Sequence, residues 1–566
     1  QDYLSVEALG DVFDFYIWSG TPREAMTAYG TLTGLPIFPP EWVFEPWAGG
    51  GGGRWRNGPL QDIALEQMAA MKKFHELDIP HSGFYAEGAG ATFYGEYKKE
   101  ELYKVVSFGE RHGFKVFSWQ FPNMTQELAQ ELLPECPKEE LPITRNKNDE
   151  EEKLPVYIDF SHPRAKELLA AQWKDRMDAG IRGSMVDFGD VVPDEAVFYD
   201  GRRGDEMHNA YAYQYAKNYR ELFEQKYGDD HVLYTRGAAP GSQHFACQFG
   251  GDQLTSFQGL KYAIAGGLSA AASGLPFWGV DAGGYDGFPD QETYLRWTEY
   301  AAFCPLMRFH GTEPREPWEY DAFTVKVYRY YTWLRENLRP YIVSVAAEAH
   351  KLGIPMMRPL AMMYPEDQEA TKVWDEYLFG EDLLVAPVSD ETEEREIYFP
   401  EGRWISLWNL NDEISGPVQR SVEVPIDKIP VYIREGSFLP LRLNESLKLG
   451  ESMSESETEM ILAVVPQNDS IVKETLYERS GAKTCCGMEK NGETIQLQIS
   501  GRTAELYVML AGIHWKNTEA IVNGRTLTKV TAREGLYFTE GYLELEEGIL
   551  VKINPSAESV IKIQKK

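Results

Sequence analysis

Between about residue 41 and residue 350, short apolar runs alternate with patterns typical of amphipathic helices. Eight such runs occur, at 42–47, 82–87, 115–119, 183–188, 232–236, 246–250, 275–280 and 305–309. A run of this length is typical of a fully buried strand, and helical patterns such as those at 60–77 and 165–179 separate most of the runs. Eight strand–helix alternations over about 310 residues predict a (β/α)8 barrel, the TIM-barrel architecture.

An open doubly wound sheet is the competing α/β architecture. It would need a glycine-rich phosphate loop after the first strand, but the glycines at 49–53 lack the G-x-G-x-x-G spacing. Sequences typical of a serine hydrolase, a zinc protease or a P-loop nucleotidase are also absent from the chain. The barrel is therefore the favoured class, with an inserted excursion predicted at 122–175.

After about residue 350 the pattern changes to strand-like runs separated by turn residues. This pattern predicts two C-terminal β-sandwich domains, at 353–440 and 441–566, after a barrel domain at 36–352. Near the start of the chain, residues 11–20 predict a strand, and a helix is expected to begin after Thr21. A chain of 566 residues is too long for one hydrophobic core, which agrees with several domains.

Composition excludes some classes of partner. Asp and Glu outnumber Lys and Arg by 88 to 56, so the formal net charge is −32. Nucleic acid and anionic lipid both need a basic surface, so neither is an expected partner. The uncharged stretch 262–280 is rich in Ala and broken by Gly and Pro, which predicts a buried helix and strand rather than a membrane span. Five cysteines without metal-ligand spacing slightly favour a cytoplasmic over a secreted protein, while compartment and oligomeric state stay open.

A TIM barrel carries its active site at the C-terminal ends of its strands. The residues where the runs end are therefore the first candidates: Glu45, Trp47, Glu87, Trp119, Asp187, Asp190, Arg236, Asp252, Trp278, Asp281 and His310. A single Asp after a strand is usually a helix cap, and a single Trp usually belongs to the core. Together, carboxylates and indoles suit a sugar, because carboxylates accept hydrogen bonds from hydroxyls and indole faces stack on C–H groups.

Two carboxylates that face each other across a sugar predict a glycosidase. The same carboxylates would also suit a metal ion, but only one histidine is among them and Trp-rich walls are unusual for a Mg²⁺ site. The sequence therefore predicts an oligosaccharide or glycoside substrate and no metal or other cofactor.

Short motifs along residues 10–440 narrow the prediction. They are GSMVDFGD at 183–190, TRGAAPGSQ at 235–243, FGGD at 249–252, FWGVDAGG at 277–284, PLMRFHG at 305–311, PMMRP at 355–359, GEDLLVAP at 380–387 and FPEGRW at 399–404. In this order they resemble glycoside hydrolase family 31. The resemblance implies a retaining, exo-acting α-glycosidase built on a TIM barrel.

The resemblance also implies roles by position. Asp187 would be the nucleophile and Asp252 the general acid/base, with their carboxyl groups ~5–5.5 Å apart. Arg236 would bind sugar hydroxyls and neutralise charge, and Asp281 and His310 would bind ring hydroxyls or orient their neighbours. The remaining residues implied to line the sugar pocket are Trp47, Glu87, Trp119, Phe249 and Trp278.

The chain departs from the family pattern at two places. Glu87, followed by small residues at 88–91, stands where the family usually has an Asp that holds the far edge of the sugar. Met185 also replaces the lysine of α-xylosidase-like members. We therefore expect altered recognition of the remote hydroxyls, with an α-galactoside or a modified hexose open beside an α-glucoside. Members also usually carry an N-terminal β-sandwich, of which only a remnant and linker are expected, at 1–35.

Other functions of the same scaffold stay open. A transglycosylase or an α-glucosidase of the family would use the same residues. A sulfoquinovosidase is disfavoured because the Gln and the Asp-Trp expected on the second strand are missing. A non-catalytic sugar-binding relative is disfavoured because the chain retains both Asp187 and Asp252.

Overall fold

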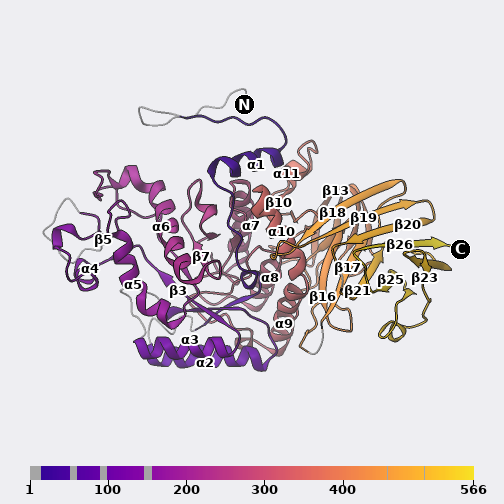
Figure 1. Cartoon of the computed structure of the whole chain (residues 1–566), viewed down its shortest axis with the longest axis horizontal. Coiled ribbons are helices and arrows are strands. Elements are labelled where there is room, and N and C mark those ends of the chain that lie inside the picture. Colours follow the sequence, from indigo (N-terminus) through magenta and orange to yellow (C-terminus); the bar gives the residue numbers. More distant parts are fainter. Residues whose placement is uncertain (1–13, 51–59, 90–97, 146–155, 455–456, 503) are drawn as a thin grey trace.

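The structure is a computed structural model that describes residues 14–50, 60–89, 98–145, 156–454, 457–502 and 504–566, without the side chains at 50, 60–62 and 87. A barrel lies on one side of the molecule and a β-rich region on the other (Figure 1). None of the described helices has both the length and the apolar run needed to cross a bilayer. Residues 262–280, which lack charge, form the end of one helix and a short strand, as predicted.

Seven parallel strands form the barrel sheet, in the order β1-β2-β3-β6-β7-β8-β9. Their bounds are β1 (Trp47–Gly50), β2 (Gly83–Ala86), β3 (Lys115–Gln120), β6 (Gly183–Val186), β7 (Val232–Thr235), β8 (Cys247–Phe249) and β9 (Trp278–Gly279). The run at 305–309 closes the ring, because Leu306 pairs with Gly279 of β9 and Arg308 pairs with Trp47 of β1. The eight runs therefore form a closed (β/α)8 barrel, as the sequence predicts.

Helices surround this barrel. They are α2 (Leu60–Glu76), α3 (Lys99–Arg111), α5 (Ala165–Ala179), α6 (Gly204–Tyr227), α7 (Phe257–Ala272), α8 (Gln291–Ala302), α9 (Ala322–Asn337) and α10 (Arg339–Leu352). Between β7 and β8 the described chain forms only the short 3-10 helix η5 (Ser242–His244). The predicted excursion holds α4 (Gln126–Leu132) and the pair β4 (Asn123–Met124) and β5 (Val156–Tyr157), while its polar run at 146–153 lies outside the described residues.

The β-rich region contains three sheets. The first has the order β10 (Met357–Pro359), β11 (Tyr377–Phe379), β12 (Leu383–Val385), β15 (Val431–Arg434), β13 (Glu394–Ser406), β14 (Glu413–Glu423). The second has the order β16 (Phe438–Leu443), β17 (Thr458–Val464), β21 (Leu506–Ala511), β25 (Gly548–Ile553), β24 (Gly541–Glu544). The third has the order β18 (Ser470–Tyr477), β19 (Lys483–Asn491), β20 (Thr494–Ser500), β26 (Glu558–Lys565), β22 (Thr518–Val522), β23 (Arg525–Thr526). The last two sheets share a buried apolar core, and β16 runs across the predicted boundary at 440.

Two predicted strands differ in the structure. Within the run at 42–47, a 3-10 helix (Glu41–Phe44) comes first and β1 begins only at Trp47. Pro46 explains part of this difference, because proline has no N–H to give to a neighbouring strand. The strand predicted at 11–20 does not form over its described part, 14–20, where Phe15 and Ile17 are exposed.

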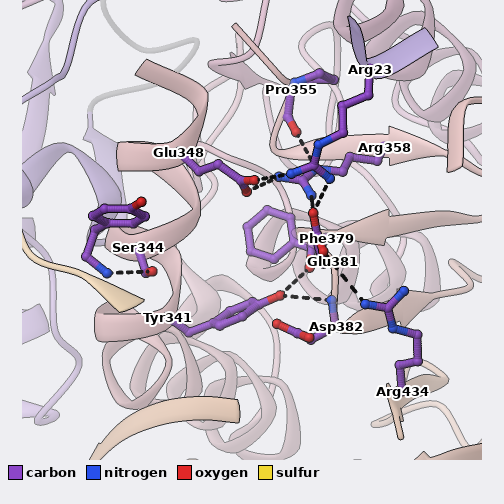
Figure 2. Close-up of polar contacts among 11 residues, drawn as sticks. Arg23, Tyr341, Ser344, Glu348, Pro355, Arg358, Phe379, Glu381, Asp382 and Arg434 are labelled. Atoms are coloured by element: carbon purple, nitrogen blue, oxygen red, sulfur yellow. Dashed lines mark hydrogen bonds and ion pairs between the residues drawn. The ribbon is translucent and has the colours of Figure 1, made fainter. Parts of the chain in front are cut away.

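A network of charges joins the barrel to the first β-sheet (Figure 2). Arg358 of β10 is fully buried and contacts Glu348 of α10, and its Nη1 lies 3.2 Å from Oε1 of Glu381. Arg23 of α1 (Pro22–Thr33) contacts the same two glutamates, and Arg434 of β15 approaches Glu381 at 3.8 Å. Each carboxylate is shared between arginines from different elements, so the network links α1 and α10 to the first β-sheet.

Candidate active site

The C-terminal ends of the barrel strands bring most of the predicted residues to one end of the barrel. Asp187 comes directly after β6, Arg236 directly after β7, and Asp252 three residues after β8. Asp281 comes two residues after β9, and His310 directly follows the run that closes the barrel. Parallel strands of a barrel end on the same face, so residues far apart in the sequence share one opening.

Asp187 is a buried carboxylate with three partners. It is 4% exposed; its Oδ2 accepts a hydrogen bond from the Trp119 indole at 3.0 Å, and its Oδ1 accepts one from the Phe188 backbone N–H at 2.8 Å. Nε of Arg236 lies 3.6 Å from Oδ1. Burial raises the pKa of Asp187, whereas Arg236, the indole and the N–H each lower it. These partners therefore favour the ionised form that a nucleophile needs.

The backbone after Asp187 helps to orient its carboxylate. Phe188 has a φ of 57°, in the left-handed region that a residue with a Cβ seldom occupies. The N–H of the same residue donates to the Asp187 side chain. Such strain persists only where surrounding contacts hold it, and the Arg236 guanidinium lies 4.3 Å from the centre of the Phe188 ring.

Arg236 also binds a second carboxylate. Its Nη2 lies 3.0 Å from Oδ1 of Asp190, and its Nε lies 3.3 Å from Oδ2 of the same residue. A two-point contact of this kind fixes the plane of the guanidinium. Asp190 thereby holds Arg236 beside Asp187, so the Asp190 carboxylate acts here as a support for the arginine.

Asp252 has a different environment. It is exposed, and it follows Gly250 and Gly251 on the segment after β8. Its charge nevertheless acts on Asp187, Arg236 and Asp281. One buried carboxylate and one exposed carboxylate at the same opening are an arrangement that allows the two groups to hold different protonation states.

Asp281 forms a fully buried pair with Arg308. Nη2 of Arg308 lies 3.1 Å from Oδ1 of Asp281, and both side chains are 0% exposed. Burial raises the pKa of Asp281 to about 7, although Arg308 lowers it. The Arg308 guanidinium also lies over the rings of Tyr85 and Tyr234, at 5.3 Å and 4.8 Å from their centres. The pair therefore forms part of the barrel interior beneath the opening.

The predicted aromatic residues separate into two groups. Trp119 is half-buried and packs on Phe121, with 4.0 Å between ring centres. Trp278 is more deeply buried, and a Cβ at Gly250 would come within 2.8 Å of its indole ring. These two tryptophans lie beside the segments that carry the candidate catalytic residues.

Trp47 and Phe249 pack inside the barrel. Trp47 is fully buried, with its ring centre 5.0 Å from that of Phe117, and Phe249 stacks on Tyr234 at 4.8 Å. Their predicted contact with the sugar stays a prediction, and in the structure both side chains are buried in the core. The reason is the alternation along a strand, which turns these two side chains into the barrel.

Of the other predicted residues, His310 lies within the site and Glu87 falls outside what is described. The His310 ring lies 4.4 Å from that of Tyr85 and 5.5 Å from that of Tyr285. The backbone of Glu87 lies in a short 3-10 helix after β2, but its side chain is outside the described set. Among the described residues, no group of His, Cys, Asp and Glu is placed to hold a metal ion.

Comparisons with known proteins agree with this geometry. The family description "Glycosyl hydrolases family 31 TIM-barrel domain" matches residues 37–345, which is more than half of the chain. The chain belongs to glycoside hydrolase family 31. The family's C-terminal domain matches residues 353–439, and this match ends close to the start of β16.

Family 31 relatives differ in how much of the chain they match. An isomaltosyltransferase from Sporosarcina globispora is 27% identical over 96% of this chain and 54% of its own length. An alpha-xylosidase from Emericella nidulans is 27% identical over 77% of this chain and 58% of its own length. The cycloalternan-forming enzyme from Listeria monocytogenes, solved with a pentasaccharide substrate, has a TM-score of 0.85 at 22% identity, over 96% of this chain and 56% of its own. The chain thus spans a little over half the length of each relative.

A Trp119→Phe variant should shift the acidic limb of the pH profile. It removes the indole N–H that stabilises the charged form of Asp187, so the pKa of Asp187 should rise. On the prediction that Asp187 is the nucleophile, its ionised form is the active one, so the acidic limb of kcat/KM should move to higher pH. At low pH, kcat/KM should fall about 10- to 100-fold, the effect of losing a hydrogen bond to a charged group.

Trp278→Phe is the matched control for this measurement. It also replaces an indole beside the site, but Trp278 makes no described hydrogen bond to Asp187. The acidic limb should keep its position in that variant. An equal shift in both variants would contradict a specific role for the Trp119 N–H.

Proposed function

We propose that this chain carries the catalytic barrel of a retaining α-glycosidase, with Asp187 as nucleophile and Asp252 as general acid/base. The observation that supports this most directly is the environment of Asp187. Its carboxylate receives two N–H donors and lies beside Arg236, while the other carboxylate, Asp252, stands exposed at the same opening. A buried, oriented carboxylate suits attack on carbon, and an exposed one suits exchange of a proton with solvent.

The reaction would proceed in two displacements. In the first, an Asp187 oxygen forms a bond to the anomeric carbon, the bond to the leaving oxygen breaks, and Asp252 gives that oxygen its proton. In the second, Asp252 takes a proton from water or from a sugar hydroxyl, which attacks the anomeric carbon and releases Asp187. While Asp187 is charged, its negative charge helps Asp252 to keep a proton for the leaving oxygen. In the intermediate that charge is gone, so Asp252 ionises more readily and can accept a proton from the attacking hydroxyl. The same residue therefore serves both steps.

For the substrate, we propose an oligosaccharide of α-linked glucose, with transfer to a second sugar competing with hydrolysis. The support is the extent of similarity, because the isomaltosyltransferase matches 96% of the chain whereas the alpha-xylosidase matches 77%. An α-galactoside or a modified hexose, expected from Glu87, is the alternative. Aryl α-glucoside, α-galactoside and α-xyloside should be compared directly, and fastest turnover of the galactoside would overturn the glucosyl assignment.

Covalent trapping tests the catalytic assignment. Treatment with 5-fluoro-α-glucosyl fluoride should inactivate the chain, add one glycosyl group by mass, and place it on the peptide that contains Asp187. A retaining enzyme forms a glycosyl ester with its nucleophile during turnover. The ester accumulates with this reagent because the ring fluorine slows its hydrolysis more than its formation. Labelling of another carboxylate, such as Asp190 or Asp281, would refute the assignment of Asp187, and absence of labelling would favour a sugar-binding protein without catalysis.

A further inference from the structure

Arg315 is a buried arginine that binds backbone carbonyls instead of a carboxylate. It is 2% exposed, and no ion pair to it occurs within the described residues. Its guanidinium donates to the carbonyl of Gly284 at 3.1 Å and 2.7 Å, to that of Tyr285 at 3.1 Å, and to that of Gly287 at 2.7 Å. Two further bonds go to the carbonyls of 313–314. The charges of Asp281 and Glu316 act on Arg315 from nearby. Burying a guanidinium is costly unless its N–H groups are satisfied, so the carbonyls that accept them are informative.

The loop at 281–287 is shaped around this guanidinium. Gly283, Gly284 and Gly287 all have positive φ, at 92°, 79° and 86°, which lets consecutive carbonyls turn toward one centre. At Gly311, a Cβ would come within 2.4 Å of Nη2 of Arg315. Glycine at 311 therefore leaves room for the guanidinium beside the loop.

The same loop holds the segment that carries Asp252. The Tyr285 N–H donates to the carbonyl of Gln253 at 2.8 Å, and the Asp281 N–H donates to Oε1 of Gln253 at 3.2 Å. Leu254 pairs with Asp286 as an isolated parallel bridge. The backbone directly after Asp252 is therefore bonded to the loop at successive residues, and Arg315 binds carbonyls of the same loop.

We infer that Arg315 is a positioning residue for the general acid/base, acting on Asp252 through the 281–287 loop. The inference rests on the proposed function of Asp252. Proton transfer to the leaving oxygen needs a distance and direction that an exposed side chain on a short segment does not set by itself. A misplacement of about 1 Å far from the chemistry costs about 100-fold in rate. Arg315 would supply this alignment without touching the substrate.

Leaving-group dependence tests this role, because only a poor leaving group needs the proton. In Arg315→Met, kcat/KM for phenyl α-glucoside should fall about 100-fold. For α-glucosyl fluoride, whose departure needs little acid assistance, kcat/KM should fall less than about fivefold. A general loss of folded protein would lower both values by the same factor, so the ratio of the two reports alignment. Arg315→Lys, which keeps the charge and some donors, should restore part of the ratio.

Arg335 is the matched control. It is also fully buried and donates to backbone carbonyls, those of Phe44 at 2.7 Å and Ala302 at 3.1 Å among them, but these precede β1 and the closing run at the other end of the barrel. Arg335→Met should lose stability and leave the ratio unchanged. Equal ratios in Arg315→Met and Arg335→Met would overturn the inference.

Asp252→Ala separates the inference from the function on which it rests. It should show the leaving-group dependence in its strongest form, and added azide should restore turnover of the fluoride by replacing water in the second step. If kcat/KM of Asp252→Ala falls by the same factor for both substrates and azide has no effect, the acid/base assignment itself fails. If Asp252→Ala behaves as expected but Arg315→Met does not, only the role of Arg315 fails.

Discussion

An Asp187→Asn variant is expected to lose at least about 10⁴-fold in kcat on an aryl α-glucoside, while its melting temperature stays level or rises slightly. The amide has nearly the same shape, but it has no charge with which to attack the anomeric carbon. Burial raises the pKa of Asp187, so the ionised carboxylate destabilises the fold above that pKa. Removing the charge therefore relieves a cost to stability, and Arg236 keeps Asp190 as its partner. Steady-state rates and thermal unfolding on the same sample measure both effects.

Asp190→Asn is the control for this experiment. Asp190 lies three residues after Asp187, contacts the same arginine and is more exposed, but it is placed to support Arg236 rather than to attack. We expect kcat of Asp190→Asn on the aryl α-glucoside to fall about tenfold, as for a weakened contact to a charged group. Asp187→Asn turnover within tenfold of the wild type, or an equal loss in both variants, would contradict the assignment of Asp187.

The barrel was predictable from its sequence because each of its central strands is buried on both sides. The runs at 115–119, 183–188 and 232–236 contain β3, β6 and β7 at nearly the predicted positions. The run at 305–309 was harder to interpret, since it forms only isolated pairs with β9 and β1. Prediction was least successful at 11–20, where apolar side chains suggest a strand but no described strand lies beside residues 14–18. Apolar composition indicates burial, whereas a strand also needs a neighbour.

The candidate site was predictable only in part. Carboxylates at strand ends could be located by position, since Asp187 and Asp281 do follow β6 and β9, while their roles stay predictions. Whether an aromatic side chain turns into the barrel or toward its opening depends on one step of alternation, so the burial of Trp47 and Phe249 in the core could not be foreseen from the sequence. Arg308 did leave a signal, because a charge within the apolar run at 305–309 needs a buried partner. Arg315 left none, since its partners are backbone carbonyls.

Replacement of Arg308 by Met should destabilise the fold increasingly as the pH rises. The Asp281 pKa is about 7 in the folded protein, well above its ordinary value of about 3.9, so the native state keeps a proton that the unfolded chain has already lost. Without Arg308, the folded pKa rises further. The free energy of unfolding should then change little at pH 5 and fall below the wild type by about 1.4 kcal/mol for each pH unit above 7, or about 3 kcal/mol at pH 9. Denaturant unfolding at several pH values measures this slope.

Replacement of the other partner, Asp281→Asn, should give a different pH dependence of the free energy of unfolding, because only one member of the pair can change its charge. A buried carboxyl can take up a proton when its partner is removed, but a guanidinium keeps its charge throughout the accessible range. Arg308 would therefore remain charged, with the rings of Tyr85 and Tyr234 as partial compensation. We expect the free energy of unfolding of Asp281→Asn, relative to that of the wild type, to stay level from pH 7 to pH 9, because over this range the wild-type carboxyl group has lost its proton in both the folded and the unfolded states. The double variant should show no pH slope above 7; if the slope persists there, another group, such as Asp187 or Asp252, causes it.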